Sequence, residues 1–358
     1  MKILNSYLAK RFYKTLALFV LVFFTIYLVI DFVQKLDNFI GAGVDKFTIL
    51  RYFVYESPYI LLQIIPPSVL LSLIVMTSIM KKYNEILAIK ISGINVFSIY
   101  QVILVCVIFL TAFVFILSEF VAPYATSKSR DIWKYEVEKH SRGQYYGSDQ
   151  VWYKGENRIY WIKHYDYKNR LLLDATFYFF DDDFRLVKKI DGTRGEWQDG
   201  RWILESGLIQ TVRPDGSYKL ERFDEHVLDI PETPETFVKE RKSPEELSFW
   251  KMKRYAEQVQ SEGYENTKYL VDMHIKIAYP VILVIMMVIG LSIPLMQKQV
   301  RIPTSVMVGI LLCFLYMVIL GFSRSLGLSG MLPPVLAAWL SNLVFLLLGA
   351  YMMGHVRR

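Results

Sequence analysis

The chain has 358 residues, of which 53% are hydrophobic, 15% are aromatic and 21% are charged, and its formal net charge is +7. The hydrophobic residues gather in blocks longer than the core of a globular domain needs, which excludes a cytosolic enzyme, a disordered chain and a small disulfide scaffold. Its two cysteines, Cys106 and Cys313, lie inside apolar blocks, so we expect no disulfide in the polar part of the chain.

Six segments contain no Asp, Glu, Lys or Arg and are long enough to cross a membrane as helices, which takes about 20 residues. They are residues 15–30, 57–80, 91–118, 277–297, 302–323 and 325–354. The first is short, but the apolar residues on either side extend it. A cleavable signal peptide is the competing interpretation of residues 1–30, but the apolar run is too long and no small-residue cleavage site follows it. The sequence therefore predicts six transmembrane helices in two groups of three.

Lysine and arginine in the short loops predict the orientation of these helices. They cluster at the N-terminus, in residues 81–90, in the turn 298–301 and at the C-terminus, where Arg357 and Arg358 end the chain. With six spans, all four clusters fall on one side, which the positive-inside rule assigns to the cytoplasm. Both termini are expected there, and the segment from about 121 to 270 is expected on the other side. This distribution accounts for the positive charge without nucleic-acid binding.

The extracytoplasmic segment has short stretches of alternating polarity separated by turn residues. The expected strands are 151–154, 158–164, 171–180, 184–197, 201–212 and 217–227, with the fourth interrupted near Asp191 and Gly192. Short strands at this spacing predict an antiparallel sandwich or jelly roll. Several strands are apolar on both faces, which fits either a packed sandwich core or an interior that accepts acyl chains.

Two helices are predicted beside the β region. One covers residues 125–139 and continues the third span. The other is expected to begin at Ser243-Pro244-Glu245-Glu246, which has the pattern of a capping box with proline in the first helical position. It is expected to end near Gly263 and to lead into the fourth span.

The cytoplasmic loop between spans two and three predicts a short amphipathic helix. Asn84 can cap it, Glu85 lies in its first turn and Gly93 can end it. Such a helix can lie on lipid headgroups, or its carboxylate can enter a basic cleft on a partner protein. The residues alone leave these two interpretations equal.

Motifs of catalysis are missing from the sequence. It contains no phosphate-binding loop, no H-E-x-x-H, no G-x-S-x-G and no S-x-x-K pattern. The five histidines are scattered, and acidic runs such as 181–183 lie in turns, where solvated carboxylates are usual. We therefore expect no catalytic residue, no metal site and no cofactor in this chain.

Several motifs occur in an order that is characteristic of one family. They are residues 84–93, 119–123, 151–160 and 247–263, followed by 276–280. By these motifs the whole chain resembles the permeases of the bacterial lipopolysaccharide-export ABC transporter, of the LptF/LptG type. The start of the β region and residues 32–36 are more similar to the G-type subunit than to the F-type.

The resemblance implies a fold of six transmembrane helices with an inserted periplasmic antiparallel β-jelly roll. Residues 1–124 would form helices one to three with a coupling helix at about 83–93. Residues 125–245 would form the β-jelly-roll domain with its leading helix, and 246–358 a connector helix and helices four to six.

The same resemblance implies the partners of the chain. It would be a multi-pass inner-membrane permease that pairs with an LptF-type paralogue and binds a dimeric cytoplasmic ATPase of the LptB type, which would hold ATP and Mg²⁺. The coupling-helix residues carried over to that contact are Glu85, Ile86, Ile89 and Gly93. The jelly roll would pass lipopolysaccharide to a periplasmic bridge of the LptC/LptA type, and spans one and five would form lateral gates.

Lipopolysaccharide carries acyl chains and a phosphorylated sugar head, so its cavity needs an apolar wall with cations at the outer rim. Four cations lie at that depth, and they are Lys35, Arg130, Lys134 and Arg324. Each can instead pair with a neighbouring acid. Asp31 and Asp37 stand where the family has lysines, which weakens phosphate recognition by the first helix.

Two other functions compete with transport. A membrane-tethered periplasmic receptor or scaffold would need no nucleotide partner and no acidic amphipathic helix in the cytoplasm. A membrane enzyme that modifies a lipid would need catalytic residues near the end of a span, and the sequence shows no such cluster.

Overall fold

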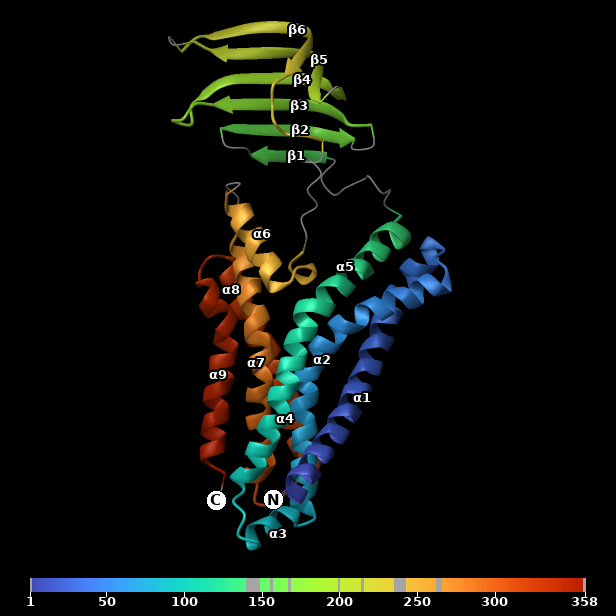
Figure 1. The fold of residues 1–358 in the computed structure, drawn as a ribbon, viewed down its shortest axis with the longest axis vertical. Coiled ribbons are helices and arrows are strands. Elements are labelled where there is room, and N and C mark those ends of the chain that lie inside the picture. Colours follow the sequence, from blue (N-terminus) through green and yellow to red (C-terminus); the bar gives the residue numbers. More distant parts are fainter. Residues whose placement is uncertain are drawn as a thin grey trace. The chain divides into compact units, whose positions relative to one another are not determined.

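The computed structural model describes residues 2–139, 149–154, 157–166, 169–198, 200–213, 216–234, 243–261 and 266–356. The chain forms two compact units (Figure 1): a helical unit of residues 1–133, 243–257 and 265–358, and a β unit of residues 134–242 and 258–264. The first division lies at residue 133 rather than at the expected 124, because the helix of residues 122–132 packs against the long helix of residues 46–82. Gly263, Arg357 and Arg358 lie outside the described residues.

The described part of the helical unit contains six helices that are long and apolar enough to cross a membrane, as predicted. They are α1 (Lys2–Ala42), α2 (Lys46–Lys82), α4 (Phe97–Ile116) with its continuation, α7 (Thr267–Met296), α8 (Ile302–Leu328) and α9 (Pro334–Gly354). The continuation of α4 consists of the π-helical turn η1 (Leu117–Val121), α5 (Ala122–Ile132) and a second π-helical turn η2 (Trp133–Val137). The short helix α3 (Glu85–Ile91) joins α2 to α4.

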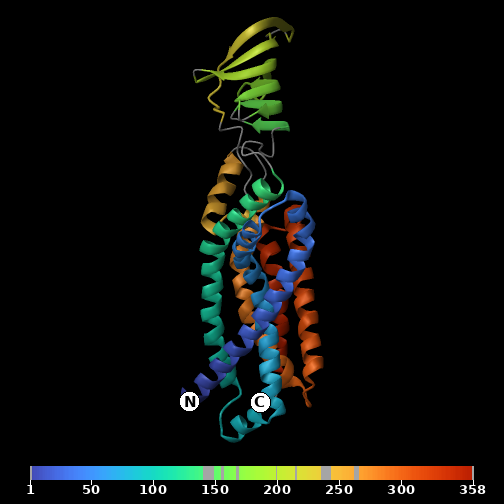
Figure 2. The ribbon, with the colours of Figure 1, turned by 90° about the vertical axis from the view of Figure 1, so that its right-hand side faces the viewer.

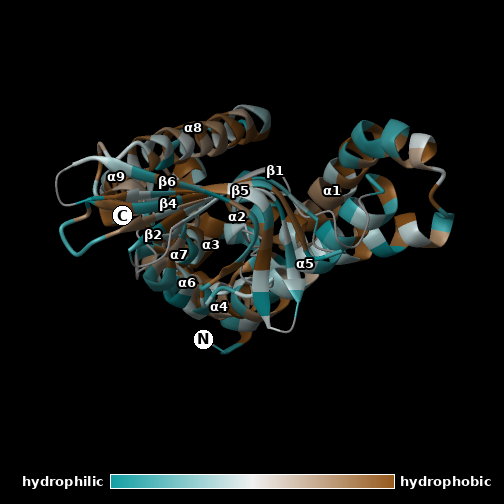
Figure 3. Cartoon of the chain, turned by 90° about the horizontal axis from the view of Figure 1, so that it is seen from above, coloured by the Kyte–Doolittle hydropathy of each residue, from teal (hydrophilic) through white to brown (hydrophobic). Residues whose placement is uncertain are grey.

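Helices α2 and α7 form the centre of the helical unit. In each, 72% of the most apolar 18-residue window is buried inside the protein, against 11% in α1 and 17% in α8. The two central helices approach closely at Gly290, where an added Cβ would lie 3.0 Å from the carbonyl oxygen of Leu70. Figure 3 shows apolar residues along α8, whose outer side chains are exposed. Helices α1 and α8 therefore present their apolar surface to the bilayer or to a partner.

The segment before α7 differs from the prediction. Residues Pro244–Glu246 form only a 3₁₀ turn (η4), and the connector helix α6 spans Phe249–Ser261. The Ser243 hydroxyl donates to the carboxylate of Glu246 at 3.0 Å instead of capping a helix. The buried carboxylate of Glu119 in η1 accepts a hydrogen bond from the Phe249 amide at 2.7 Å. A distant part of the chain thus supplies the acceptor for a backbone N–H at the start of α6, which has no partner within the helix. A capping pattern in the sequence could not reveal this long-range acceptor.

The described strands of the β unit form one antiparallel six-stranded sheet. They are β1 (Asp149–Lys154), β2 (Arg158–Asp166), β3 (Leu171–Phe180), β4 (Leu186–Gln198), β5 (Arg201–Val212) and β6 (Tyr218–Leu228). The antiparallel β domain between the two groups of helices is confirmed, but its described strands follow one another in chain order in a single sheet, without the crossover of a two-sheet jelly roll. Strand β4 is not interrupted at residues 191 and 192, because Gly192 pairs with both neighbouring strands.

One face of the sheet is filled with aromatic and aliphatic side chains. Tyr160 lies opposite Phe177 in the register, and Phe177 lies opposite Ile190; all three are buried. Glu232, in the segment after β6, covers this face: its carboxylate accepts from the Tyr160 hydroxyl at 2.9 Å, and its carbonyl oxygen accepts from the Trp202 indole at 2.9 Å. These residues form a packed core, which is one of the two interpretations that the sequence left open for the apolar strands.

We predict that Gly207→Ala destabilises the β unit. Gly207 lies opposite Gly192, and an added Cβ would overlap the carbonyl oxygen of Asp191 and the ring of Phe223. Overpacking of this kind costs about 1–3 kcal/mol of unfolding free energy. The measurement is the rate of proteolysis within residues 134–242 of the full-length protein as temperature rises. Gly41→Ala in α1 is the control, because its Cβ would meet no atom within 4 Å; equal stability of the two variants would contradict the prediction.

Candidate functional site

Helix α3 lies at the same end of the helical unit as both chain termini (Figures 1 and 2). Asn84 separates it from α2 by taking a left-handed conformation with φ +60°, which asparagine tolerates. The Asn84 side chain makes no capping hydrogen bond, contrary to the sequence prediction. Gly93, with φ +77°, ends the turn after α3 as expected, and its Cα faces open space.

The side chains of α3 separate into an inner and an outer face. Ile86 is 4% exposed and belongs to the core of the helical unit, and Ile89 packs against that core. Leu87 and Ile91 point outward and are 52% and 78% exposed. The predicted contact residues Ile86 and Ile89 thus lie on the inner face, and the sequence analysis did not single out Leu87 and Ile91. The i, i+4 spacing of Leu87 and Ile91 shows in the sequence that they share a helix face. Which face of the helix points outward depends on how it packs against the other helices.

Glu85 is held by two side chains of α1. The Arg11 guanidinium donates to both carboxylate oxygens, at 2.8 and 2.6 Å, and the Tyr7 hydroxyl donates at 2.9 Å. Arg11 also donates to the Tyr7 hydroxyl. Partial burial opposes ionisation of Glu85, but the hydrogen bonds from Arg11 and Tyr7 outweigh burial and lower the pKa of Glu85 below its ordinary value. The carboxylate is therefore ionised, and Arg11 balances its charge.

At the opposite end of the helical unit, residues of α1, α2, α5, η2 and η4 line an open cavity of about 270 Å³. It has aromatic walls and both acidic and basic groups; the lining residues are Lys35, Tyr52, Glu56, Tyr59, Thr126, Ser129, Arg130, Trp133 and Glu245. The Lys35 ammonium lies 2.7 Å from Asp31 and 2.7 Å from the Tyr52 hydroxyl, over the Tyr52 and Trp133 rings. The hydroxyl oxygen of Thr126 is buried and has no hydrogen-bond partner among the described residues. We call this space the aromatic cavity.

The four predicted lipid-contacting cations have different surroundings. Lys35 and Arg130 are brought together in the aromatic cavity, where Arg130 pairs with Glu246 at 2.7 Å and with Glu245 at 3.1 Å. Arg324 in α8 instead holds Asp272 of α7 through two hydrogen bonds of 2.7 and 3.0 Å. Lys134 belongs to the β unit, where its ammonium lies 6.0 Å from the centre of the Tyr135 ring.

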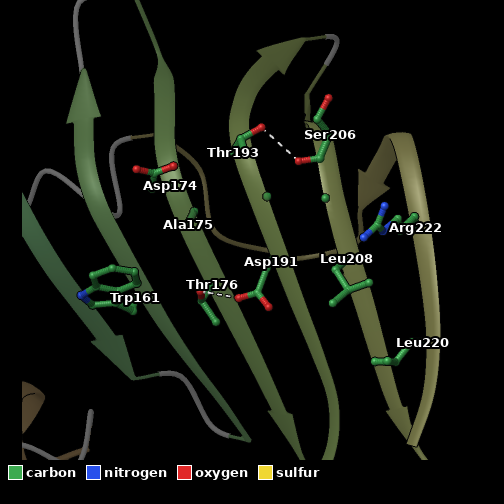
Figure 4. Close-up of a pocket in the computed structure, with 12 residues that line it drawn as sticks. Trp161, Asp174, Ala175, Thr176, Asp191, Thr193, Ser206, Leu208, Leu220 and Arg222 are labelled. Carbon is green, nitrogen blue, oxygen red and sulfur yellow. Dashed lines mark hydrogen bonds between the residues drawn. The ribbon is translucent and has the colours of Figure 1, made fainter.

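The β unit has a groove on the face opposite its aromatic core (Figure 4). A row of residues paired across five strands forms its floor: Trp161, Thr176, Asp191, Leu208 and Arg222. The Thr176 hydroxyl donates to the Asp191 carboxylate at 2.6 Å, and the volume of the groove is about 660 Å³. Its mixed polar and apolar lining can accept an amphipathic molecule.

Membrane-length helices before and after an inserted antiparallel sheet define a multi-pass membrane protein with a large domain outside the bilayer. The family "Lipopolysaccharide export system permease LptF/LptG" matches residues 6–355, and the chain belongs to this family, as predicted. Its members are permease components of lipopolysaccharide-export ABC transporters in the inner membrane and are not themselves catalytic.

Two similar proteins, from Escherichia coli K12 and Escherichia coli O6:H1, are each named lipopolysaccharide export system permease protein LptG. Each is 22% identical to this chain over 362 residues, which cover 98% of both proteins. These names agree with the predicted similarity to the G-type subunit.

We predict that the contact between Arg130 and Glu245 weakens at acidic pH. Burial raises the pKa of Glu245, but a backbone hydrogen bond, Ser243 and the Arg130 charge outweigh it and lower that pKa. A lowered pKa gives stability that is fully present above the ordinary glutamate value of about 4.3 and is lost as the pH falls through the folded-state value. Thermal unfolding of the full chain should therefore be less pH-dependent below pH ~4.3 for Glu245→Gln than for the parent. Glu257→Gln, at an exposed residue of α6, is the control and should follow the parent; identical profiles for both variants would contradict the prediction.

Proposed function

We propose that this chain, together with an LptF-type paralogue, extracts lipopolysaccharide from the inner membrane and passes it through its periplasmic β unit toward an LptC/LptA-type bridge. ATP hydrolysis in a dimeric LptB-type ATPase supplies the energy, so this chain binds neither ATP nor Mg²⁺. The termini and α3 lie in the cytoplasm in this proposal, and the β unit lies in the periplasm. The observation that carries it is the whole-length family match of a chain whose α3 presents apolar side chains between spans two and three.

Docking of the ATPase on α3 is supported by the outer face of that helix. Leu87, Ile91 and the preceding Tyr83 are each more than half exposed, and they extend beyond a short helix anchored by the buried Ile86. An apolar helix face of this kind fits a groove on a partner protein. Because Arg11 already balances the charge of Glu85, apolar contact contributes more to docking than the carboxylate does.

Capture of the lipid head is supported by the aromatic cavity. Its cations are held by carboxylates: Lys35 by Asp31, and Arg130 by Glu245 and Glu246. A phosphate can replace a carboxylate as the acceptor of these charge-assisted hydrogen bonds. The exposed apolar faces of α1 and α8 suit the lateral gates through which acyl chains reach the space between the two permeases.

We predict that Leu87→Asp and Glu85→Lys each lower recovery of the ATPase with the purified permease pair. Leu87→Asp places a charge in an apolar contact, and Glu85→Lys puts a cation beside Arg11 and displaces α3. Loss of one such contact is expected to weaken binding about ten-fold, or ~1.4 kcal/mol. Proteolysis of the β unit should be unchanged.

Ser92→Ala is the matched control, because Ser92 is exposed and its hydroxyl donates to the Ala88 carbonyl oxygen of the same turn. Unchanged ATPase recovery in both test variants would refute docking on α3. A parent chain that purifies with neither an ATPase nor lipopolysaccharide would instead be a membrane-tethered periplasmic receptor or scaffold.

We predict that replacing Arg130 and Lys134 together by glutamine lowers photocrosslinking of lipopolysaccharide to the β unit several-fold. Two cations that can bind phosphate are removed, and hydrogen bonds to charged groups contribute about 1.5–3 kcal/mol each. The crosslinker is placed in the β unit of the complete transporter, and ATP starts the reaction. Lys128→Gln is the control, because Lys128 is exposed and forms a long ion pair of 3.8 Å with Asp131. If the double variant crosslinks like the parent, these cations have no part in lipid transfer.

A further inference from the structure

Helix α1 is attached to the rest of the helical unit at a few places only. Only 11% of its most apolar window is buried, and its buried side chains in the half near α3 are Leu8, Phe12 and Leu16. Apolar contacts have no preferred direction, so they define the position of a helix less sharply than hydrogen bonds do. Two polar contacts position this end of α1. The Tyr13 hydroxyl donates to the Cys106 carbonyl oxygen of α4 at 3.2 Å, and Tyr7 and Arg11 bind Glu85, which joins α1 to α3.

The geometry of that contact ties α1 to α3 at one point. Tyr7 and Arg11 are four residues apart on α1, so they share one face of the helix. Both reach the same carboxylate, which is 74 residues from Arg11 in the sequence. The Arg11 and Glu85 side chains are 21% and 29% exposed, so water screens the pair only partly. Short hydrogen bonds between charged groups are about twice as strong as neutral ones.

The two faces of α3 make this contact suited to transmit motion. Ile86 fixes the inner face in the core, whereas Leu87 and Ile91 leave the outer face open. A partner bound to the outer face can displace α3 against the core. Glu85, next to Ile86, carries such a displacement directly to Arg11 and Tyr7.

We propose that Arg11 is a coupling residue, which transmits displacement of α3 to α1 through its ion pair with Glu85. The inference rests on the proposed docking of an ATPase on α3. Because α1 exposes most of its apolar surface, its displacement changes the side of the bundle that faces lipid or the paralogous permease. Arg11 acts through Glu85 and touches neither ATP nor lipopolysaccharide.

The test uses the complete transporter of both permeases and the ATPase, reconstituted in vesicles that contain lipopolysaccharide. Three quantities are measured for each variant: recovery of the ATPase, thermal stability, and lipopolysaccharide released per ATP hydrolysed. In Arg11→Gln we expect release per ATP to fall about ten-fold, the size expected for losing hydrogen bonds to a charged group. ATPase recovery should persist, because Glu85 and the outer face of α3 remain. Arg11→Lys, which keeps the charge, should restore part of the coupling.

Lys10→Gln is the matched control, since it removes an adjacent exposed cation of α1 and should leave release per ATP unchanged. Unchanged release per ATP in Arg11→Gln would overturn the inference. A loss of ATPase recovery in Arg11→Gln as large as the loss of release per ATP would also overturn the inference, because Arg11 would then only hold α3 in place. If Arg11→Gln does not assemble, Tyr7→Phe decides, since it removes the 2.9 Å hydrogen bond to Glu85 and the one accepted from Arg11 without changing charge. It should lower release per ATP two- to three-fold, and no change would also overturn the inference.

Failure of the inference is distinguishable from failure of the proposed function. A parent transporter that never binds the ATPase refutes the proposed function. A parent that binds the ATPase and releases lipid, with Arg11→Gln doing the same at the same ratio, refutes only the coupling role of Arg11.

Discussion

The hydrocarbon of a bilayer offers no hydrogen-bond partner to a peptide group, and most of this architecture follows from that constraint. A segment that crosses it must be a helix of about 20 residues or more, and six such helices account for the apolar blocks of the chain. The sheet has open edges and charged side chains, so it must lie outside the bilayer. The central helices α2 and α7 contact mainly protein, whereas α1 and α8 keep their apolar residues on the outside.

Polar side chains near the ends of the helices define how the helices are joined. Arg324 of α8 binds Asp272 of α7, and Glu119 supplies the missing acceptor at the start of α6. The contact of Arg11 with Glu85 joins α1 to α3 in the same way. Near the membrane surface, such contacts are screened less than in bulk water and give direction to packing that is otherwise non-directional. A cation at a helix end therefore links two helices through its ion pair and is also a group that a phosphate can bind.

Lys35 and Arg130 illustrate these two roles of a cation at a helix end. Both line the aromatic cavity, and both are held by carboxylates of the same chain. In the proposed function, the cations are thus oriented before a ligand arrives, and a phosphorylated head competes with those carboxylates. Competition of this kind favours release as well as capture, which a transporter needs.

The sequence alone determined the number of spans, the insertion of an antiparallel domain and the family, because membrane-length apolar runs and alternating strands are local patterns. It located the strands within a few residues and placed a short helix before Gly93. Tertiary structure decided which face of α3 points outward, since the positions of Ile86 and Leu87 depend on the helices behind them. It also decided the partners of Glu85, Arg130 and Arg324, because these ion pairs join residues 52 to 116 positions apart and no local spacing encodes such distances.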